Sequence, residues 1–278
     1  MKLLTANRAT KLLYNFIRVN HISGRVLLPA NVCPDVVTTL QHAGLTVSFI
    51  DLQPDTLCLS QETALALARD ARMLLFVHTY GLEREFTDFF LQLREQNPDL
   101  IIVDDKCLCL PDLEVRDSAA DLVLYSTGER KMVSLGGGAI GYLADQWEYD
   151  EVAVEGCDCL TNELWLLDPK QLYMKMDTII AHKEKLNTIY RALLPEALQL
   201  PNAYQHWRFH ILVQDKQPIL QALLAEGIAA ESLYASLDEA CLVASNLHRY
   251  VISLPNDKSL TAEQATRACE IINACLEG

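Results

Sequence analysis

The chain has 278 residues, half of them hydrophobic and 22% charged, which is typical of an ordinary folded protein with one large domain or with a large and a small one. Its formal net charge of −14 argues against binding to nucleic acids or anionic membrane surfaces, because both would repel it. No apolar run approaches the roughly 20 residues of a membrane span, and Asn7, Arg8 and Lys11 interrupt the apolar centre that a signal peptide would need, so we expect a cytoplasmic protein.

The first 145 residues predict alternating helices and strands. Ser60 is placed to cap one of these helices, and Pro98 is placed to end another. The short apolar runs between and after the helices predict strands. The predicted helices are residues 7–20, 33–44, 60–71 and 85–98, and the predicted strands are residues 25–30, 46–52, 72–81, 100–105, 120–126 and 137–143.

This alternation indicates an α/β fold with a mainly parallel sheet sandwiched by helices. From about residue 160 the pattern changes to a long helix, ended by Pro195, and then to mixed helices and strands. We therefore expect a large domain over residues 1–155, followed over residues 156–278 by a linking long helix and a smaller C-terminal α+β domain. The elements predicted there are helices 169–195, 216–228 and 261–276 and strands 206–213 and 249–255.

The cysteines and histidines predict no metal site. Nine cysteines is an odd count, and they are scattered among aliphatic residues, as is usual for reduced thiols in a cytosolic protein. The pairs Cys107/Cys109 and Cys157/Cys159 lack the usual C-x₂-C spacing of a zinc site. His206 and His210 have the spacing of ligands on a helix but lie in a predicted strand, where they are poor co-ligands.

The stretch "YSTGERKMVSLGGGAIGYL", residues 125–143, contains the letters of a dinucleotide-binding loop. Gly136, Gly138 and Gly141 match G-x-G-x-x-G, but that fingerprint requires a helix after its last glycine to receive the pyrophosphate. The residues that follow here predict a strand. We therefore reject a dinucleotide site.

The same stretch places Lys131 between Ser126 and the glycines, as a site for a covalently held aldehyde cofactor would. Pyridoxal phosphate needs a lysine for a Schiff base, a carboxylate at its pyridine nitrogen and donors for its phosphate. Lys131 and Ser126 offer the amine and a phosphate donor, and Asp104 or Asp105 offers the carboxylate at a strand end, where alternation lets only one of them face the cofactor. The competing interpretation of Lys131 is a surface lysine. Backbone N–H groups at the first helix, near Asn7, Arg8 and Ala9, would add phosphate donors.

Together, "VLLPANVCPDVVTTLQHAGLTVSFIDL", "LLFVHTYG", "LIIVDD" and "ADLVLYSTGERKMVSLGGGAIGYL" resemble the DegT-type aminotransferases of fold type I, best known to act on nucleotide-linked keto sugars. That family has a lysine on the fifth residue after a serine and then a glycine cluster, which Ser126, Lys131 and Gly136 to Gly138 match. The resemblance implies pyridoxal phosphate, amino transfer from a donor such as glutamate to a keto acceptor, and a homodimer. It favours Asp105 over Asp104 as the partner of the pyridine nitrogen.

Several departures from the family concern the substrate more than the cofactor. Cys33 stands where the family usually has a bulky aromatic residue over the ring, "KCLC" follows the aspartate in place of glutamine or histidine, and Arg130 beside Lys131 is unusual. The family has a longer N-terminal segment that helps to close the substrate site, whereas this sequence begins almost at the first helix, so we do not expect that segment here. These changes keep two alternatives open: a protein of this fold that binds the cofactor without transferring amines, or a lyase.

Three further residues have both a functional and a plain structural interpretation, and a fourth has a functional one. His78 either touches the cofactor or substrate or is a buried, hydrogen-bonded histidine. Trp207 and Arg208 either face a substrate from the small domain or belong to the core. Asn162 is a candidate for reaching the phosphate of a partner subunit.

Overall fold

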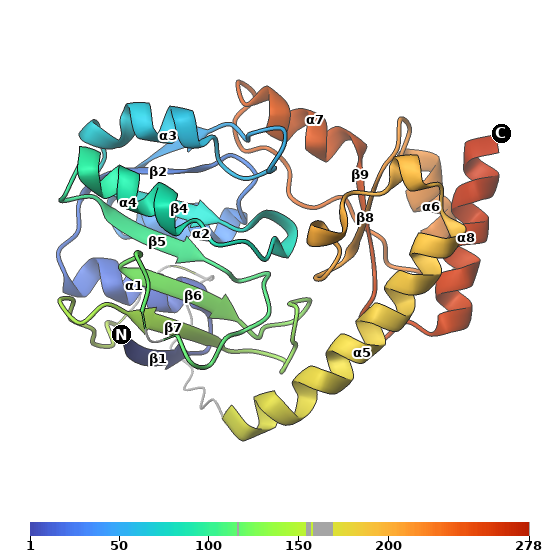
Figure 1. Ribbon diagram of the computed structural model, residues 1–278, viewed down its shortest axis with the longest axis horizontal. Helices are drawn as coiled ribbons and strands as arrows, with labels where there is room; N and C mark the ends of the chain where they lie inside the picture. Colours follow the sequence, from blue (N-terminus) through green and yellow to red (C-terminus); the bar gives the residue numbers. More distant parts are fainter. Residues whose placement is uncertain (116, 154–156, 158–168, 278) are drawn as a thin grey trace.

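The computed structural model describes residues 1–115, 117–153, 157 and 169–277, and its largest element is a seven-stranded sheet (Figure 1). The strand order is β1-β7-β6-β5-β4-β2-β3. Strands β2 to β6 pair in parallel, whereas β7 is antiparallel to both β6 and β1. The strands are β1 (Lys2–Ala6), β2 (Gly24–Pro29), β3 (Leu45–Ile50), β4 (Met73–Val77), β5 (Ile101–Asp105), β6 (Leu122–Ser126) and β7 (Ala139–Leu143).

Helices cover both faces of this sheet, which confirms the predicted α/β class. Helices α1 (Ala9–Val19) and α2 (Pro34–His42) share one buried cluster with the sheet residues Ile101 and Val103. Helices α3 (Gln61–Leu67) and α4 (Thr87–Gln96) share the other with Ile102. Successive residues of β5 thus enter opposite cores, as the period of two in a strand requires.

A second, two-stranded antiparallel sheet joins β8 (Phe209–Leu212) to β9 (Val251–Leu254). Helices α5, α6 and α8 supply the buried residues that pack against it, and the long α5 runs diagonally toward it in Figure 1. The helices of this part are α5 (Pro169–Leu193), α6 (Gln217–Ala225), α7 (Leu242–Tyr250) and α8 (Ala262–Glu277). The predicted domain boundary at 155/156 falls among residues outside the described ones, so that division stays a prediction.

Two elements were not predicted from the sequence. No element was predicted before residue 7, yet β1 completes the sheet edge against β7. Helix α7 is capped from a distance: Asp51, just after β3, accepts hydrogen bonds from the backbone N–H groups of Val243 (2.9 Å) and Ala244 (3.0 Å). A cap 192 residues away in sequence leaves no local start signal.

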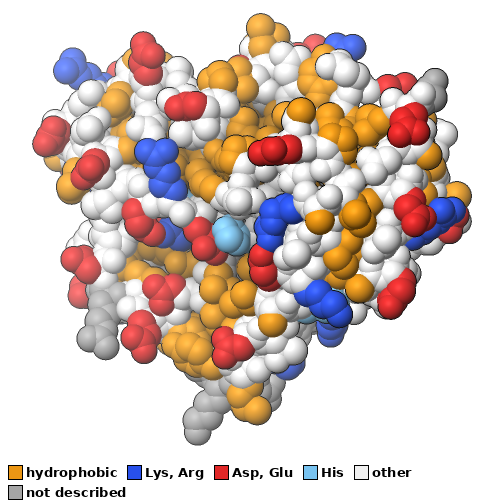
Figure 2. All heavy atoms as spheres, turned by 45° about the vertical axis from the view of Figure 1, so that its right-hand side comes forward, with side chains coloured by type: hydrophobic (Ala, Val, Ile, Leu, Met, Phe, Trp, Pro, Cys, Tyr) orange, Lys and Arg blue, Asp and Glu red, His pale blue; other side chains and the backbone are white. Residues whose placement is uncertain are grey.

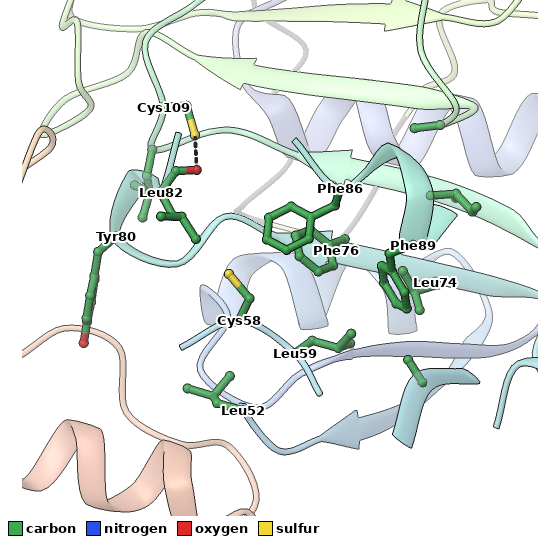
Figure 3. Packing of buried hydrophobic residues seen from close by; sticks show 14 of the residues in the cluster. Leu52, Cys58, Leu59, Leu74, Phe76, Tyr80, Leu82, Phe86, Phe89 and Cys109 are labelled. Atoms are coloured by element: carbon green, nitrogen blue, oxygen red, sulfur yellow. Dashed lines mark hydrogen bonds between the residues drawn. The ribbon is translucent and has the colours of Figure 1, made fainter. Parts of the chain in front are cut away.

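The predicted strand 72–81 ends earlier, at Val77. The chain turns there because Tyr80 (φ +54°) and Gly81 (φ +78°) both have left-handed backbone conformations. A Cβ atom at Gly81 would lie 2.5 Å from the carbonyl oxygen of Leu108, so only glycine fits. Figure 3 shows Tyr80 pointing away from the phenylalanine cluster around Phe76 toward the C-terminal part of the chain.

The two histidines weighed as metal ligands have different surroundings. His206 is exposed, and His210 is fully buried, with its ring stacked on Tyr80 at 4.2 Å between centroids. Among the described residues, no group of three or more His, Cys, Asp or Glu side chains could hold a metal ion. No helix in the same residues is both long and apolar enough to cross a membrane.

Burial of His210 predicts a loss of stability in acid. Its Nδ1 donates to the carbonyl oxygen of Tyr204 (2.8 Å), and burial lowers its pKa from 6.5 to about 3. As the pH falls below about 6.5, His210 binds a proton in the unfolded chain but stays neutral in the folded chain. The free energy of unfolding should therefore fall by about 2 kcal/mol between pH 7 and pH 5 from this group.

Denaturant unfolding of the His210→Asn variant tests this, because asparagine keeps a donor near the Nδ1 position and does not titrate. We expect the variant to lose about 2 kcal/mol less than the wild type between pH 7 and pH 5. The same change at the exposed His206 is the matched control. Identical pH dependence in the wild type and His210→Asn would contradict the assignment.

Candidate functional site

The carboxyl ends of three neighbouring parallel strands line a cavity of about 390 Å³. Val77 ends β4, Asp105 ends β5 and Ser126 ends β6, and all three line the cavity. Val77 and Asp105 are direct partners in the sheet, and Leu124 lies opposite Asp105 on the other side. Open α/β sheets bind their ligands at this edge.

Alternation along the strands selects which end residues can enter this cavity. Ile101, Val103 and Leu124 face the core under α1 and α2, so Asp105 and Ser126, two residues further in each strand, face the same side. Asp105 is 7% exposed and lines the cavity, and its Oδ1 accepts a hydrogen bond from the backbone N–H of Cys107 (3.0 Å).

Asp104 and His78, two of the predicted cofactor contacts, are not among the residues lining the cavity. Asp104 faces the other side of the sheet, where its Oδ1 lies 2.8 Å from Nε2 of His78. The second ring nitrogen of His78 is hydrogen-bonded to the carbonyl oxygen of Leu82 (2.8 Å). His78 is thus the buried, hydrogen-bonded histidine of the two alternatives, and Asp105 is the carboxylate available to a ligand.

Lys131 reaches the cavity from the loop that follows β6. Its backbone N–H donates to the carbonyl oxygen of Gly128 (3.3 Å), which curls the loop back toward the strand end. A Cβ atom placed on Gly128 would lie 3.5 Å from Oγ of Ser126 and 4.0 Å from Cγ of Lys131. The serine hydroxyl and the lysine stem therefore approach the same point.

The glycine run is tied to the end of β6 and to the N-terminal segment. The hydroxyl of Thr127 donates to the carbonyl oxygen of Gly137 (2.8 Å), and the N–H of Gly138 donates to the carbonyl oxygen of Asn7 (2.8 Å). Gly136 and Gly138 have φ of +84° and +101°, which favour glycine. The glycines thus let the backbone turn beside the cavity.

Helices α1 and α2 complete one wall. Asn7, Arg8 and Ala9, at the start of α1, line the cavity together with Cys33, which directly precedes α2. The first turn of α1 contains no acidic residue, so its positive dipole end is not offset there by a side chain of its own. Such a helix start favours anions such as phosphate.

Sequence reasoning missed several residues that line the cavity, among them Tyr234 and Asn31. Tyr234 comes from the segment between α6 and α7, so the C-terminal part of the chain also contributes to the cavity. Asn31 follows β2 at the same sheet edge, and within the described residues its buried Oδ1 has no hydrogen-bond partner. The strand-end rule could have found Asn31, whereas no pattern marks Tyr234.

The cavity favours a charged Lys131 in the absence of ligand. Burial lowers the pKa of Lys131, but the surrounding groups, Tyr234 first and then Cys107 and Asp105, outweigh burial and raise it. Burial also raises the pKa values of Tyr234, Cys107 and Cys33, so these three groups are neutral near pH 7. Asp105 is the carboxylate among the groups that raise the pKa of Lys131.

The C-terminal part of the chain holds the lysine loop in place. Nε1 of Trp207 donates to the carbonyl oxygen of Arg130 (2.7 Å), and Nη1 of Arg130 lies 2.7 Å from Oε1 of Glu231. Arg130 has a left-handed φ of +61°, which costs a non-glycine residue roughly 1 kcal/mol or more. These contacts stabilise the strained residue next to Lys131.

Of the remaining sequence candidates, two lie outside the described residues and two are thiols that face different parts of the fold. Asn162 and Cys159 lie outside the described residues. Cys107 lines the cavity, but Cys109 points to the other core, where its thiol donates to the carbonyl oxygen of Leu82 at 3.8 Å (Figure 3). These two thiols therefore do not converge on one ligand.

Comparison with known proteins finds similarity in structure only. No family model matches the sequence, and no curated protein matches it either. A putative sugar aminotransferase, Spr1654 from Streptococcus pneumoniae in its PLP form, superposes with a TM-score of 0.81 at 17% identity, over 99% of this chain and 87% of that one. The chain has the fold of the DegT-type sugar aminotransferases.

Two further aminotransferases also have structures similar to that of this chain. A DegT DnrJ EryC1 StrS aminotransferase from Brucella abortus gives a TM-score of 0.77 at 16% identity, over 99% of this chain and 86% of that one. Helicobacter pylori PseC, an aminotransferase involved in pseudoaminic acid biosynthesis, gives 0.77 at 16% identity, over 100% of this chain and 87% of that one. At such identity the likeness to these aminotransferases establishes the fold alone.

The electrostatics of this cavity predict that Asp105→Asn lowers the pKa of Lys131, because one of the groups that act against burial is lost. Lys131 should then be acylated faster at pH 8, because a larger fraction of its amine is neutral. Mass spectrometry of the modified peptide measures that rate. Asp104→Asn is the matched control, and an equal acceleration in that variant would contradict the assignment of Asp105.

Proposed function

We propose that this protein is a pyridoxal-phosphate-dependent aminotransferase that moves an amino group from an amino acid, glutamate being the expected donor, to a keto acceptor of the keto-sugar class. The observation that carries the proposal is the meeting of Lys131, Asp105 and Ser126 in one cavity at the strand ends. The shared fold of sugar aminotransferases supports it.

The residues of the cavity fit pyridoxal phosphate. An amine, a carboxylate and a hydroxyl face the same space, the start of α1 adds an anion-binding helix end, and the buried Oδ1 of Asn31 has no partner among the described residues. When bound, the cofactor supplies an aldehyde carbon that bonds to amines and a protonated ring that accepts electron density.

Asp105 and the phosphate donors would hold the group at its two ends. The carboxylate of Asp105 would accept a charge-assisted hydrogen bond from the ring nitrogen, which keeps that nitrogen protonated. Ser126 and the backbone N–H groups near Asn7, Arg8 and Ala9 would bind the phosphate. Cys33 would contribute a small neutral surface where an aromatic residue would cover the ring.

Lys131 would supply the covalent link and then move the proton at the substrate carbon. A proton acceptor must be neutral, and the pull of Asp105, beside those of Tyr234 and Cys107, raises the pKa of Lys131 in the ligand-free cavity. Once Asp105 pairs with a cation of the ligand, that pull weakens. Burial then lowers the pKa of Lys131, so that its Nζ can accept the proton and return it.

Assembly as a homodimer and a cytoplasmic location remain predictions that accompany this function. Glutamate as donor and a keto sugar as acceptor likewise rest on resemblance, because one fold hosts many substrates.

The function is tested with cofactor-loaded protein and glutamate. We expect the wild type to show an absorbance band near the edge of the visible range, and glutamate should bleach it while one equivalent of 2-oxoglutarate forms. Lys131→Ala should show neither the band nor the conversion, because the covalent link and the proton acceptor are lost. Lys106→Ala is the control, since Lys106 binds Glu85 (2.8 Å) and does not line the cavity.

The other outcomes separate the alternatives. A lysine-dependent band that glutamate leaves unchanged, with no keto acid formed for any donor tried, supports a cofactor-binding protein that does not transfer amines. Product release without conversion of the cofactor supports a lyase. An unchanged band in Lys131→Ala contradicts the proposed site altogether.

A further inference from the structure

A second cavity, of about 740 Å³, adjoins the first. It lies between the lysine loop, helix α5, the residues just before β8 and the start of α8. Lys131 lines both cavities, so its side chain stands where the two spaces meet. The volume is in the range of sites for small organic molecules.

This second cavity is basic in an acidic protein. The chain carries a net charge of −14, and acidic side chains are spread over the face drawn in Figure 2. Three carboxylates line the cavity, those of Glu129, Glu231 and Asp257. The lysines and arginines that line it number twice as many: Arg130, Lys131, Lys175, Lys183, Arg208 and Lys258.

Arg208 is the most unusual of these cations. It is only 6% exposed, and no hydrogen bond among the described residues uses its guanidinium group, whose buried Nη1 is left without a partner. Its nearest carboxylate oxygen, Oε2 of Glu231, lies 3.7 Å from Nη2, and the other oxygen of Glu231 is taken by Arg130 at 2.7 Å. Leaving a buried donor unpaired is unfavourable, because it has lost its hydrogen bonds to water without replacement.

A planar oxyanion would satisfy this group, because a guanidinium presents paired N–H donors to carboxylate or phosphate oxygens. Lys183 adds positive charge nearby. It is buried and donates to the carbonyl oxygen of Trp207 and to Oδ1 of Asn256, both at 2.8 Å, and no carboxylate lies within ion-pair distance of it in the described structure.

We propose that the second cavity binds the oxyanion of a small molecule, a carboxylate or a phosphate, with Arg208 as its principal donor. Such an anion would lie at the far end of a ligand whose near end meets Lys131. The identity of that ligand as a substrate rests on the proposed function, but the anion site itself does not require the cofactor.

Calorimetry of the cofactor-free protein tests the site, with glutarate and inorganic phosphate titrated separately at constant ionic strength. At least one of them should bind, and Arg208→Gln should weaken that binding at least tenfold. Arg249→Gln removes an equal charge from an exposed position outside both cavities and should leave binding unchanged. Ser126→Ala distinguishes phosphate bound in the first cavity from phosphate bound in the second. Ser126 lines only the first cavity, so the variant should lose only the phosphate bound there.

A readout in the wild type covers the case in which Arg208→Gln does not fold. The Trp207 ring lies 5.6 Å from Cζ of Arg208, so binding of the anion should change the Trp207 fluorescence, and a Trp207→Phe variant identifies that signal. Arg208→Lys keeps the charge without the planar donors and should still bind more weakly.

The results identify which anion binds, and they also test whether the site exists. Binding of glutarate alone indicates a carboxylate ligand, and binding of phosphate alone indicates a phosphorylated one. Equal affinity in wild type and Arg208→Gln, or no binding of either anion at millimolar concentration, overturns the proposal. Either result together with intact conversion of glutamate would leave the proposed function standing.

Discussion

The site depends on one geometric constraint: parallel strands end at the same edge of a sheet, and their side chains alternate between its faces. Because β4, β5 and β6 are neighbours, their last residues, Val77, Asp105 and Ser126, all line the same cavity. Because the period is two, Asp105 enters the cavity while Asp104 turns to the opposite core and pairs with His78. A shift of one residue in β5 would exchange the roles of the two carboxylates.

The loop that carries Lys131 is less regular and is held by contacts from far along the chain. Arg130 has a left-handed backbone, and the indole of Trp207 and the carboxylate of Glu231 hold it from the C-terminal part. Glu231 also lies near Arg208 in the second cavity. The same carboxylate thus contacts an arginine of the lysine loop and lies near the buried arginine of the second cavity.

The sequence was sufficient for the regular parts of the fold and for the residues fixed by strand ends. Alternating apolar runs predicted the sheet and most of its helices, and the Ser126–Lys131–glycine spacing predicted residues that do meet in space. Prediction from the sequence failed for features that depend on residues far away in the chain. Asp51 caps α7 from the other end of the chain, and β1 becomes a strand only by pairing with β7. Tyr234 reaches the cavity from a segment without a periodic pattern. His78 was left open because its partner, Asp104, lies 26 residues away in sequence.

The central claim is that Lys131 forms the covalent link to pyridoxal phosphate in the cavity at the strand ends. Borohydride reduction of the loaded protein, followed by peptide mapping, locates that link most directly. The account predicts one reduced adduct, on the peptide that contains Lys131. An adduct on another lysine, such as the buried Lys183 of the second cavity, or none at all, would contradict it.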